Sequence, residues 1–184
     1  MNIPVHESIL ITAQQAQPDS IFQSPCAPLN CEIRAGETIF IMGLQYSISL
    51  RYMKILAGIE APVAGHIMLR DYAGENITPQ QLRQKVGFVL RGGPLLSVLN
   101  GLENLKLAAR YHSLGDETFI DKKARELIKQ MPHKVEYQLL PAYMTKLQRR
   151  HLAIARPLML DPLMLFIDNP FDGLGCQGRE AVAN

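Results

Sequence analysis

The chain has 184 residues, of which 47% are hydrophobic and 20% are charged, and its formal net charge is +2. This composition excludes a disordered chain, which would be more polar and more highly charged. The near-neutral charge gives no reason to expect nucleic acid or an anionic membrane as a partner. No apolar run reaches the roughly 18 residues of a membrane span, so no membrane insertion is expected. The length predicts a single globular domain with a sizeable core.

Cysteine and histidine usage indicates the compartment and the absence of a metal centre. The odd number of cysteines (Cys26, Cys31 and Cys176) and their lack of paired spacing predict reduced thiols and a cytoplasmic location. The N-terminus has no basic stretch followed by an apolar run, so no secretory signal is predicted. The five histidines are scattered without metal-ligand spacing, and no metal site is expected from them.

The first half of the chain predicts antiparallel strands followed by a central strand. Alternation of apolar and polar residues predicts a half-buried strand at 9–13, a loop at 14–28 and a second strand at 29–33. Residues 38–42 (TIFIM) are apolar on both faces, which is typical of a central strand covered on both sides. Beyond it we expect helices at 47–57 and 79–83, with a strand at 65–69 between them.

The second half predicts two buried strands that flank a helical insert. Residues 86–90 (VGFVL) are expected to form a buried strand, and residues 163–167 (LMLFI) a fully buried one. Asp168 follows the second strand, where α/β sheets place functional groups. Helices are expected between the strands at 102–111, 118–130 and 145–155.

The order of these pieces resembles the ATP-binding subunit of ABC transporters. The runs that carry the resemblance are EIRAGET (32–38), KILAGI (54–59), LRQKVGFV (82–89), AIAR (153–156) and the Walker B-like strand that ends at Asp168. The resemblance implies an α/β fold: a P-loop NTPase-like ABC ATPase core with an N-terminal antiparallel β subdomain and a helical subdomain at about 95–150, in one domain over 1–184. The family domain normally continues to a switch histidine, so this chain is expected to lack the usual C-terminal segment.

The family's phosphate-binding pattern, GxxGxGK[ST], falls on residues 43–50. A phosphate cradle needs glycines at its turns, a Lys at the β/γ-phosphates and a hydroxyl on Mg²⁺. Only Gly43 matches, because Ser49 stands at the Lys position and Leu50 at the hydroxyl position. The segment is therefore either kept for packing or left with residual phosphate binding through the helix N-terminus and Ser47 or Ser49.

Two further catalytic positions of the family are replaced. Asn169 stands where the resemblance places a Glu general base, and an amide cannot accept a proton near neutral pH. Arg91 stands at the Gln that senses Mg²⁺, and a guanidinium cannot accept a hydrogen bond. Asp168 is open to two interpretations, a structural acid at the strand end or a Mg²⁺ ligand; ATP and Mg²⁺ are the only cofactors that the pattern suggests.

The family's LSGGQ signature, which binds the phosphate held by the opposite subunit, aligns with residues 144–148. Thr145 keeps a hydroxyl and can cap the following helix, and Gln148 keeps the amide. Lys146 and Leu147 add bulk where two glycines normally allow close approach. The segment is therefore predicted to cap its own helix and to serve a partner's nucleotide poorly.

Three functions remain open from the sequence. The first is a non-hydrolysing ABC ATP-binding-domain protein, acting as a structural or regulatory partner of a membrane permease or of another ABC ATPase subunit. It would be cytoplasmic and would reach the inner face of the membrane through that partner. The first alternative is a working ATPase with atypical motifs, in which Arg51 or Lys54 reaches the phosphates. The second is a reused cleft that binds a protein through the apolar residues Tyr46, Ile48, Leu50 and Leu147.

Overall fold

The computed structural model describes residues 8–19, 26–42, 45–131 and 136–172. The chain divides into two compact units, Met1–Leu82 and Arg83–Asn184. The single domain expected over 1–184 stays a prediction. None of the helices in the described ranges has the length and apolar character needed to cross a membrane.

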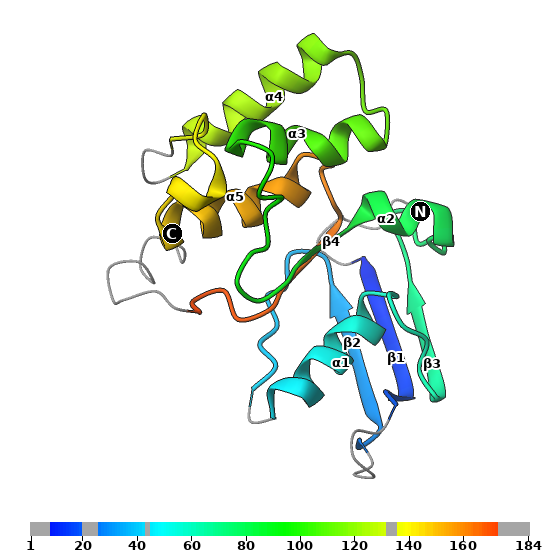
Figure 1. Ribbon diagram of the computed structural model, residues 1–184. Coiled ribbons are helices and arrows are strands. Elements are labelled where there is room, and N and C mark those ends of the chain that lie inside the picture. Colours follow the sequence, from blue (N-terminus) through cyan, green and yellow to red (C-terminus); the bar gives the residue numbers. More distant parts are fainter. Residues whose placement is uncertain (1–7, 20–25, 43–44, 132–135, 173–184) are drawn as a thin grey trace. The chain divides into compact units, whose positions relative to one another are not determined.

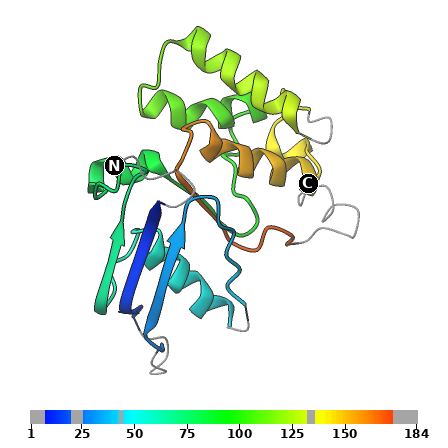
Figure 2. The same cartoon turned by 180° about the vertical axis from the view of Figure 1, so that it is seen from behind.

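The first unit is built on a three-stranded antiparallel sheet (Figure 1). Strand β1 (Ile9–Gln17) lies between β2 (Leu29–Arg34) and β3 (Ala64–Leu69). Helix α1 (Tyr46–Leu56) lies against one face of this sheet, as the view from behind in Figure 2 also shows. The antiparallel N-terminal strands are confirmed, although β1 runs to Gln17, where it pairs with Ala64 of β3, so the loop begins later than expected.

The strand expected at residues 38–42 is not present. The structure gives these residues no strand, and the side chains of Ile39, Phe40 and Met42 are 55%, 71% and 81% exposed. A strand requires neighbouring backbone groups to complete its hydrogen bonds, and the sheet of this unit ends at β2. Apolar character on both faces was therefore an insufficient signal for a central strand at this position.

The second unit joins a small parallel sheet to a group of helices. Strand β4 (Val86–Val89) pairs in parallel with β5 (Met164–Ile167), and Val89 lies opposite Ile167. The remaining elements are α2 (Pro79–Lys85), which spans the boundary between the units, α3 (Gly101–Tyr111), α4 (Glu117–Gln130), the 3₁₀ helix η2 (Pro141–Tyr143) and α5 (Lys146–Leu158). All the expected helices are confirmed to within a few residues.

Strand β5 is less covered than its sequence predicts. Of its four residues only Met164 is buried, and Leu165 is 37% exposed. In the described residues the parallel sheet has two strands. Strand β5 therefore has one neighbouring strand in the sheet, and few side chains lie beside its own on either face. The prediction of a fully buried strand was therefore wrong for β5, although its position was right.

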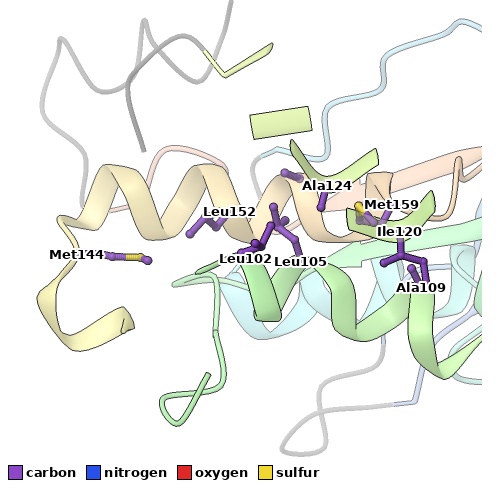
Figure 3. Close-up of a cluster of buried hydrophobic side chains, with 9 residues drawn as sticks. Leu102, Leu105, Ala109, Ile120, Ala124, Met144, Leu152 and Met159 are labelled. Carbon is purple, nitrogen blue, oxygen red and sulfur yellow. The ribbon is translucent and has the colours of Figure 1, made fainter. Parts of the chain in front are cut away.

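The helices of the second unit enclose a continuous apolar core (Figure 3). Leu105, Ile120 and Leu152, from α3, α4 and α5, and Met159, which follows α5 as its C-cap, are at most 2% exposed and point toward one another. Burial of each such side chain contributes about 1.5–3 kcal/mol. This core fixes α5, and so it also fixes the polar residues at the start of that helix.

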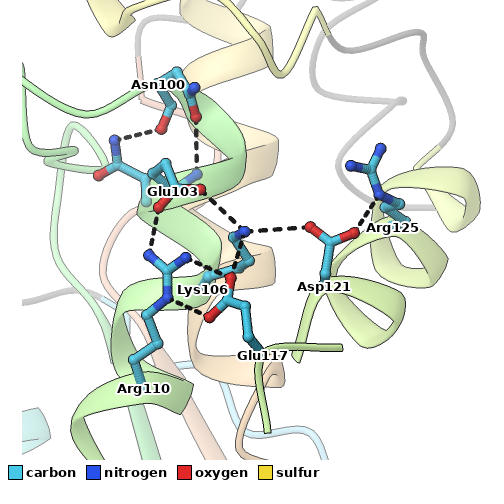
Figure 4. A network of polar contacts seen from close by, with 8 residues as sticks. Asn100, Glu103, Lys106, Arg110, Glu117, Asp121 and Arg125 are labelled. Atoms are coloured by element: carbon cyan, nitrogen blue, oxygen red, sulfur yellow. Dashed lines mark hydrogen bonds and ion pairs between the residues drawn. The ribbon is translucent and has the colours of Figure 1, made fainter. Parts of the chain in front are cut away.

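A network of charged side chains joins α3 to α4 (Figure 4). Lys106 is almost fully buried, and its Nζ lies 3.0 Å from Glu103, 2.9 Å from Glu117 and 3.2 Å from Asp121. Burial lowers the pKa of Lys106, but hydrogen bonds to the three carboxylates outweigh it and the net pKa is raised. Arg110 pairs with both Glu103 and Glu117. The network therefore holds its lysine charged between the two helices.

This network should make the protein sensitive to acid. Hydrogen bonds from Arg110 and Lys106 lower the pKa of Glu117 to about 2, from 4.5. A carboxylate with a lowered folded-state pKa stabilises the fold fully above about pH 4.5, and this stabilisation is lost as the pH falls toward 2. The Glu117→Gln variant should therefore take up about one proton fewer than the parent protein when it unfolds in this pH range. The pH dependence of the free energy of unfolding in urea measures this difference.

The matched control for this prediction is Glu126→Gln on the same helix. Among the described residues no cation forms an ion pair with Glu126, so this substitution should leave the acid slope close to that of the parent. Equal slopes for Glu117→Gln and the parent protein would contradict the role assigned to the network.

Candidate functional site

The residues expected at a phosphate loop precede and begin α1. Gly43 lies outside the described residues, and so does the side chain of Tyr46. The backbone N–H groups of Ile48 and Ser49 both donate to the carbonyl of Gln45, at 2.9 and 3.0 Å. Ser47 is exposed and Ser49 is half-buried. Two backbone donors that a phosphate cradle would use therefore close the first turn of the helix instead.

The two cations proposed to replace the missing Lys already have carboxylate partners. The Nζ of Lys54 lies 2.6 Å from Glu60 Oε1, whereas Arg51 approaches Asp19 only to 3.9 Å. Lys54 is thus held by a close ion pair, and Arg51 is the better placed of the two to turn toward a ligand.

Of the apolar residues expected to mark a reused cleft, those whose side chains the structure describes are half-buried and not exposed. Ile48 and Leu50 are half-buried on α1, and Leu147 is half-buried on α5. The described residues among this set therefore do not form the exposed patch that an interaction surface would require.

The second unit brings three of the predicted site residues together at the carboxyl ends of β4 and β5. Parallel strands end at the same edge of a sheet, so Arg91, after β4, meets Asp168 and Asn169, after β5. Asp168 is only 4% exposed, and its Oδ2 accepts a hydrogen bond from the backbone N–H of Arg91 at 3.3 Å. The guanidinium of Arg91 lies 3.1 Å from Asp172 Oδ1. Its hydrogen bond holds the pKa of Asp172 below the ordinary value, with smaller contributions from Arg150 and Lys146.

A buried arginine that is not among the sequence-predicted site residues fixes this edge. Arg150 of α5 is 3% exposed and donates to four backbone carbonyl groups: those of Leu90, Asp168, Asn169 and Pro170, at 3.0–3.1 Å. Burial lowers the pKa of Arg150, while Asp168 and Asp172 act in the opposite direction. We call this set of bonds the Arg150 clamp. Its signal in the sequence is weak: Arg150 precedes the apolar Ala153 and Ile154 by three and four residues and so shares a helix face with them.

The backbone at Asn169 has a conformation that explains the residue type. Its φ is +47°, in the left-handed region, and its carbonyl accepts a hydrogen bond from Arg150. Asparagine tolerates this region better than most other residues. Asn169 therefore has a structural reason for its place, in addition to lacking the proton acceptor that the resemblance implies.

The signature-like residues at the start of α5 bond to one another. The Gln148 N–H donates to Thr145 Oγ1 at 3.2 Å, and the Thr145 N–H donates to Gln148 Oε1 at 2.9 Å. This reciprocal arrangement is a capping box, so the predicted capping role of Thr145 is confirmed. The side chain of Lys146 is exposed.

These residues do not fit a magnesium ion. Mg²⁺ prefers near-octahedral oxygen coordination, usually with one or two carboxylates. Here the carboxylate of Asp168 accepts a hydrogen bond from the backbone N–H of Arg91, and the carboxylate of Asp172 is paired with the Arg91 guanidinium. Nowhere in the described parts of the chain do three or more His, Cys, Asp or Glu side chains gather in a way that could hold a metal ion.

Comparison with known proteins relates the chain to ABC transporter proteins. Residues 26–172 match the model of the family described as "ABC transporter". The chain is 28% identical to a sulfate/thiosulfate import ATP-binding protein of Pseudomonas aeruginosa, over 84% of the chain and 47% of the relative. It is 30% identical to a protein of the same name from Bacillus cereus, over 84% of the chain and 43% of the relative. The chain thus spans about half the length of these relatives.

Solved structures show the same fold. One is a dimeric ATP-binding cassette in a post-hydrolysis state, bound to ADP and Pi. It superposes with a TM-score of 0.78 at 22% sequence identity, and the match covers 94% of this chain and 79% of the cassette chain. The cbiO1 protein of Clostridium perfringens, part of an ABC transporter complex, superposes with a TM-score of 0.77 at 20% sequence identity. This match covers 96% of this chain and 71% of the cbiO1 chain. The expected α/β fold, with an antiparallel sheet and helices, is confirmed.

Proposed function

Because the chain belongs to the ABC transporter family of ATP-binding proteins, we propose that it serves as the ATP-binding subunit of an ABC-type import complex. The observation that carries the proposal is the family match over residues 26–172. The relatives named import ATP-binding proteins favour this working subunit over the purely structural role that the replaced motif residues first suggested. The subunit would lie at the inner face of the membrane, held there by a permease.

An exposed apolar rim at the start of α3 supports a permease partner. It consists of residues that are 39–82% exposed, from the segments that precede α3 and α5: Leu96, Val98, Leu139, Leu140 and Tyr143. The two segments are joined where the Gly101 N–H donates to the Leu139 carbonyl at 3.1 Å. Apolar side chains presented together in this way are typical of a protein interface.

The part of the rim that precedes α3 is held in place by a buried amide. Asn104 is fully buried; its Oδ1 accepts from the Leu96 N–H at 2.7 Å, and its Nδ2 donates to the carbonyls of Leu96, Leu99 and Asn100. All the polar atoms of this side chain therefore fix the segment that carries Leu96 and Val98. A preorganised segment loses less conformational entropy when a partner binds.

The proposal is tested by recovering the tagged chain from solubilised membranes of its own organism. Tyr143→Glu should reduce the amount of co-purified permease about tenfold, because it places a charge in the apolar rim. Tyr111→Glu is the matched control, since Tyr111 is 72% exposed and Tyr143 is 74% exposed. Recovery of the parent chain without any permease, or equal losses from both variants, would overturn the proposal.

A second candidate, a subunit that assembles without hydrolysing ATP, is favoured by the residues themselves. Ser49 supplies no cation, Asn169 supplies no general base, and the N–H groups of Ile48 and Ser49 bond within α1. Phosphate release by the purified complex separates the two candidates. Turnover that Asp168→Asn abolishes would establish the working ATPase, whereas a complex without turnover would establish the non-hydrolysing subunit.

A further inference from the structure

Two arginines and two carboxylates lie together at the ends of β4 and β5, all in the second unit. The acids are Asp168 and Asp172, and the bases are Arg91 and Arg150. Their formal charges cancel, so the cluster leaves no net negative charge to attract a cation. The guanidinium of Arg150 is directed at backbone carbonyls, whereas that of Arg91 contacts a carboxylate directly, at 3.1 Å.

We propose that the guanidinium of Arg91 takes the place of a divalent cation at this strand edge, so that the unit excludes Mg²⁺ and Mn²⁺ by means of a cation of its own. Arg91 satisfies the acidic edge in two ways: its backbone N–H donates to Asp168, and its side chain neutralises Asp172. A metal ion would have to displace this ion pair and approach a fixed positive charge. The paired edge is therefore complete without an ion.

The position of Arg91 is fixed by the surrounding backbone. The carbonyl of Leu90, its chain neighbour, accepts from Arg150 Nη1 at 3.0 Å, and the Asp168 N–H donates to the Val89 carbonyl at 2.8 Å. The two strand ends are thus tied to each other and to α5 before the side chain of Arg91 is considered. A substitution of this side chain should therefore leave the edge in place and change only its charge.

The test measures binding of Mn²⁺ alone, by electron paramagnetic resonance of the free ion. The parent protein should bind Mn²⁺ at the strand edge too weakly to detect, and Arg91→Gln should bind it about tenfold or more tightly, because a neighbouring positive charge is removed. Arg91→Gln keeps the backbone bond to Asp168. The gain should disappear in the double variants Arg91→Gln/Asp168→Asn and Arg91→Gln/Asp172→Asn.

Two further variants separate charge from shape. Arg91→Lys keeps the cation and should exclude Mn²⁺ as the parent does. Arg34→Gln is the matched control, because the side chain of Arg34, like that of Arg91, is 44% exposed and pairs with one carboxylate, at 3.2 Å. The inference is overturned if the parent binds Mn²⁺ in a manner that Asp168→Asn abolishes, or if Arg91→Gln gains no more affinity than Arg34→Gln. The inference concerns the strand edge of the proposed ATP-binding subunit, and its success would favour the second candidate, the subunit that does not hydrolyse ATP. The test uses neither nucleotide nor permease, so its failure would leave the proposal of a permease-bound subunit standing.

Discussion

Replacement of Ser49 by Lys is expected to tighten the binding of ATP by about 10- to 100-fold, the range of a charge-assisted hydrogen bond. Ser49 stands at the position where the family has the lysine that meets the β/γ-phosphates, and none of the residues 43–50 is cationic. Lys54 is held by Glu60 at 2.6 Å and does not supply the charge. Isothermal titration of the purified chain with ATP, with and without Mg²⁺, measures the change.

The matched control is Ser47→Lys, which adds the same charge two residues earlier in the same helix. Its side chain leaves the helix in a different direction, so it should raise affinity only through weak, salt-sensitive attraction. An equal increase for the two variants would indicate general electrostatics rather than a phosphate position. If Ser49→Lys brings no increase, the segment does not retain the geometry of a phosphate loop.

The elements that the sequence predicted well are those determined by local interactions. Helix α5 begins after Thr145 because the side chains of Thr145 and Gln148 each accept a hydrogen bond from the other residue's backbone N–H. Such a capping pattern is complete in four residues. The helices also carry apolar residues at helical spacing, of which Leu105 and Leu152 are examples that meet in the core. Local pattern and tertiary packing agree at these positions.

The features that the sequence did not predict depend on partners distant in the chain. Residues 38–42 are as apolar as a central strand but form none in the structure, because a strand is defined by its neighbours as well as by its own residues. The role of Arg150 was not predicted because its acceptors are backbone carbonyls, the farthest of them 60 residues away. A carbonyl acceptor belongs to every residue type, so it leaves no mark in the sequence.

The candidate site divides in the same way. The replacement of the Lys and Glu positions by Ser49 and Asn169 could be read directly from the aligned motifs. The left-handed φ of Asn169 and the pairing of Arg91 with Asp172 could not. Both depend on how β4 and β5 end beside each other, which is a property of the parallel register and not of either segment alone.

Removal of the Arg150 clamp should be the most destabilising single change in the second unit. Arg150→Ala is expected to lower the free energy of unfolding by about 3–5 kcal/mol, because four backbone carbonyls lose a charged donor in a largely buried place. Arg150→Lys should recover only part of this loss, since one ammonium cannot match a planar fork that reaches the Leu90, Asp168, Asn169 and Pro170 carbonyls together. Urea unfolding followed by circular dichroism gives the loss for each variant.

Arg156→Ala provides the comparison on the same helix. Arg156 makes one such bond, to the Pro94 carbonyl at 3.0 Å, and its removal should cost about 1 kcal/mol. Native-state hydrogen exchange then locates the effect: Arg150→Ala should speed exchange of the amides in β4 and β5 first, because the clamp joins their ends. A loss no greater than that of Arg156→Ala, or one spread evenly over both units, would show that packing around α5 orders the strand edge without the clamp.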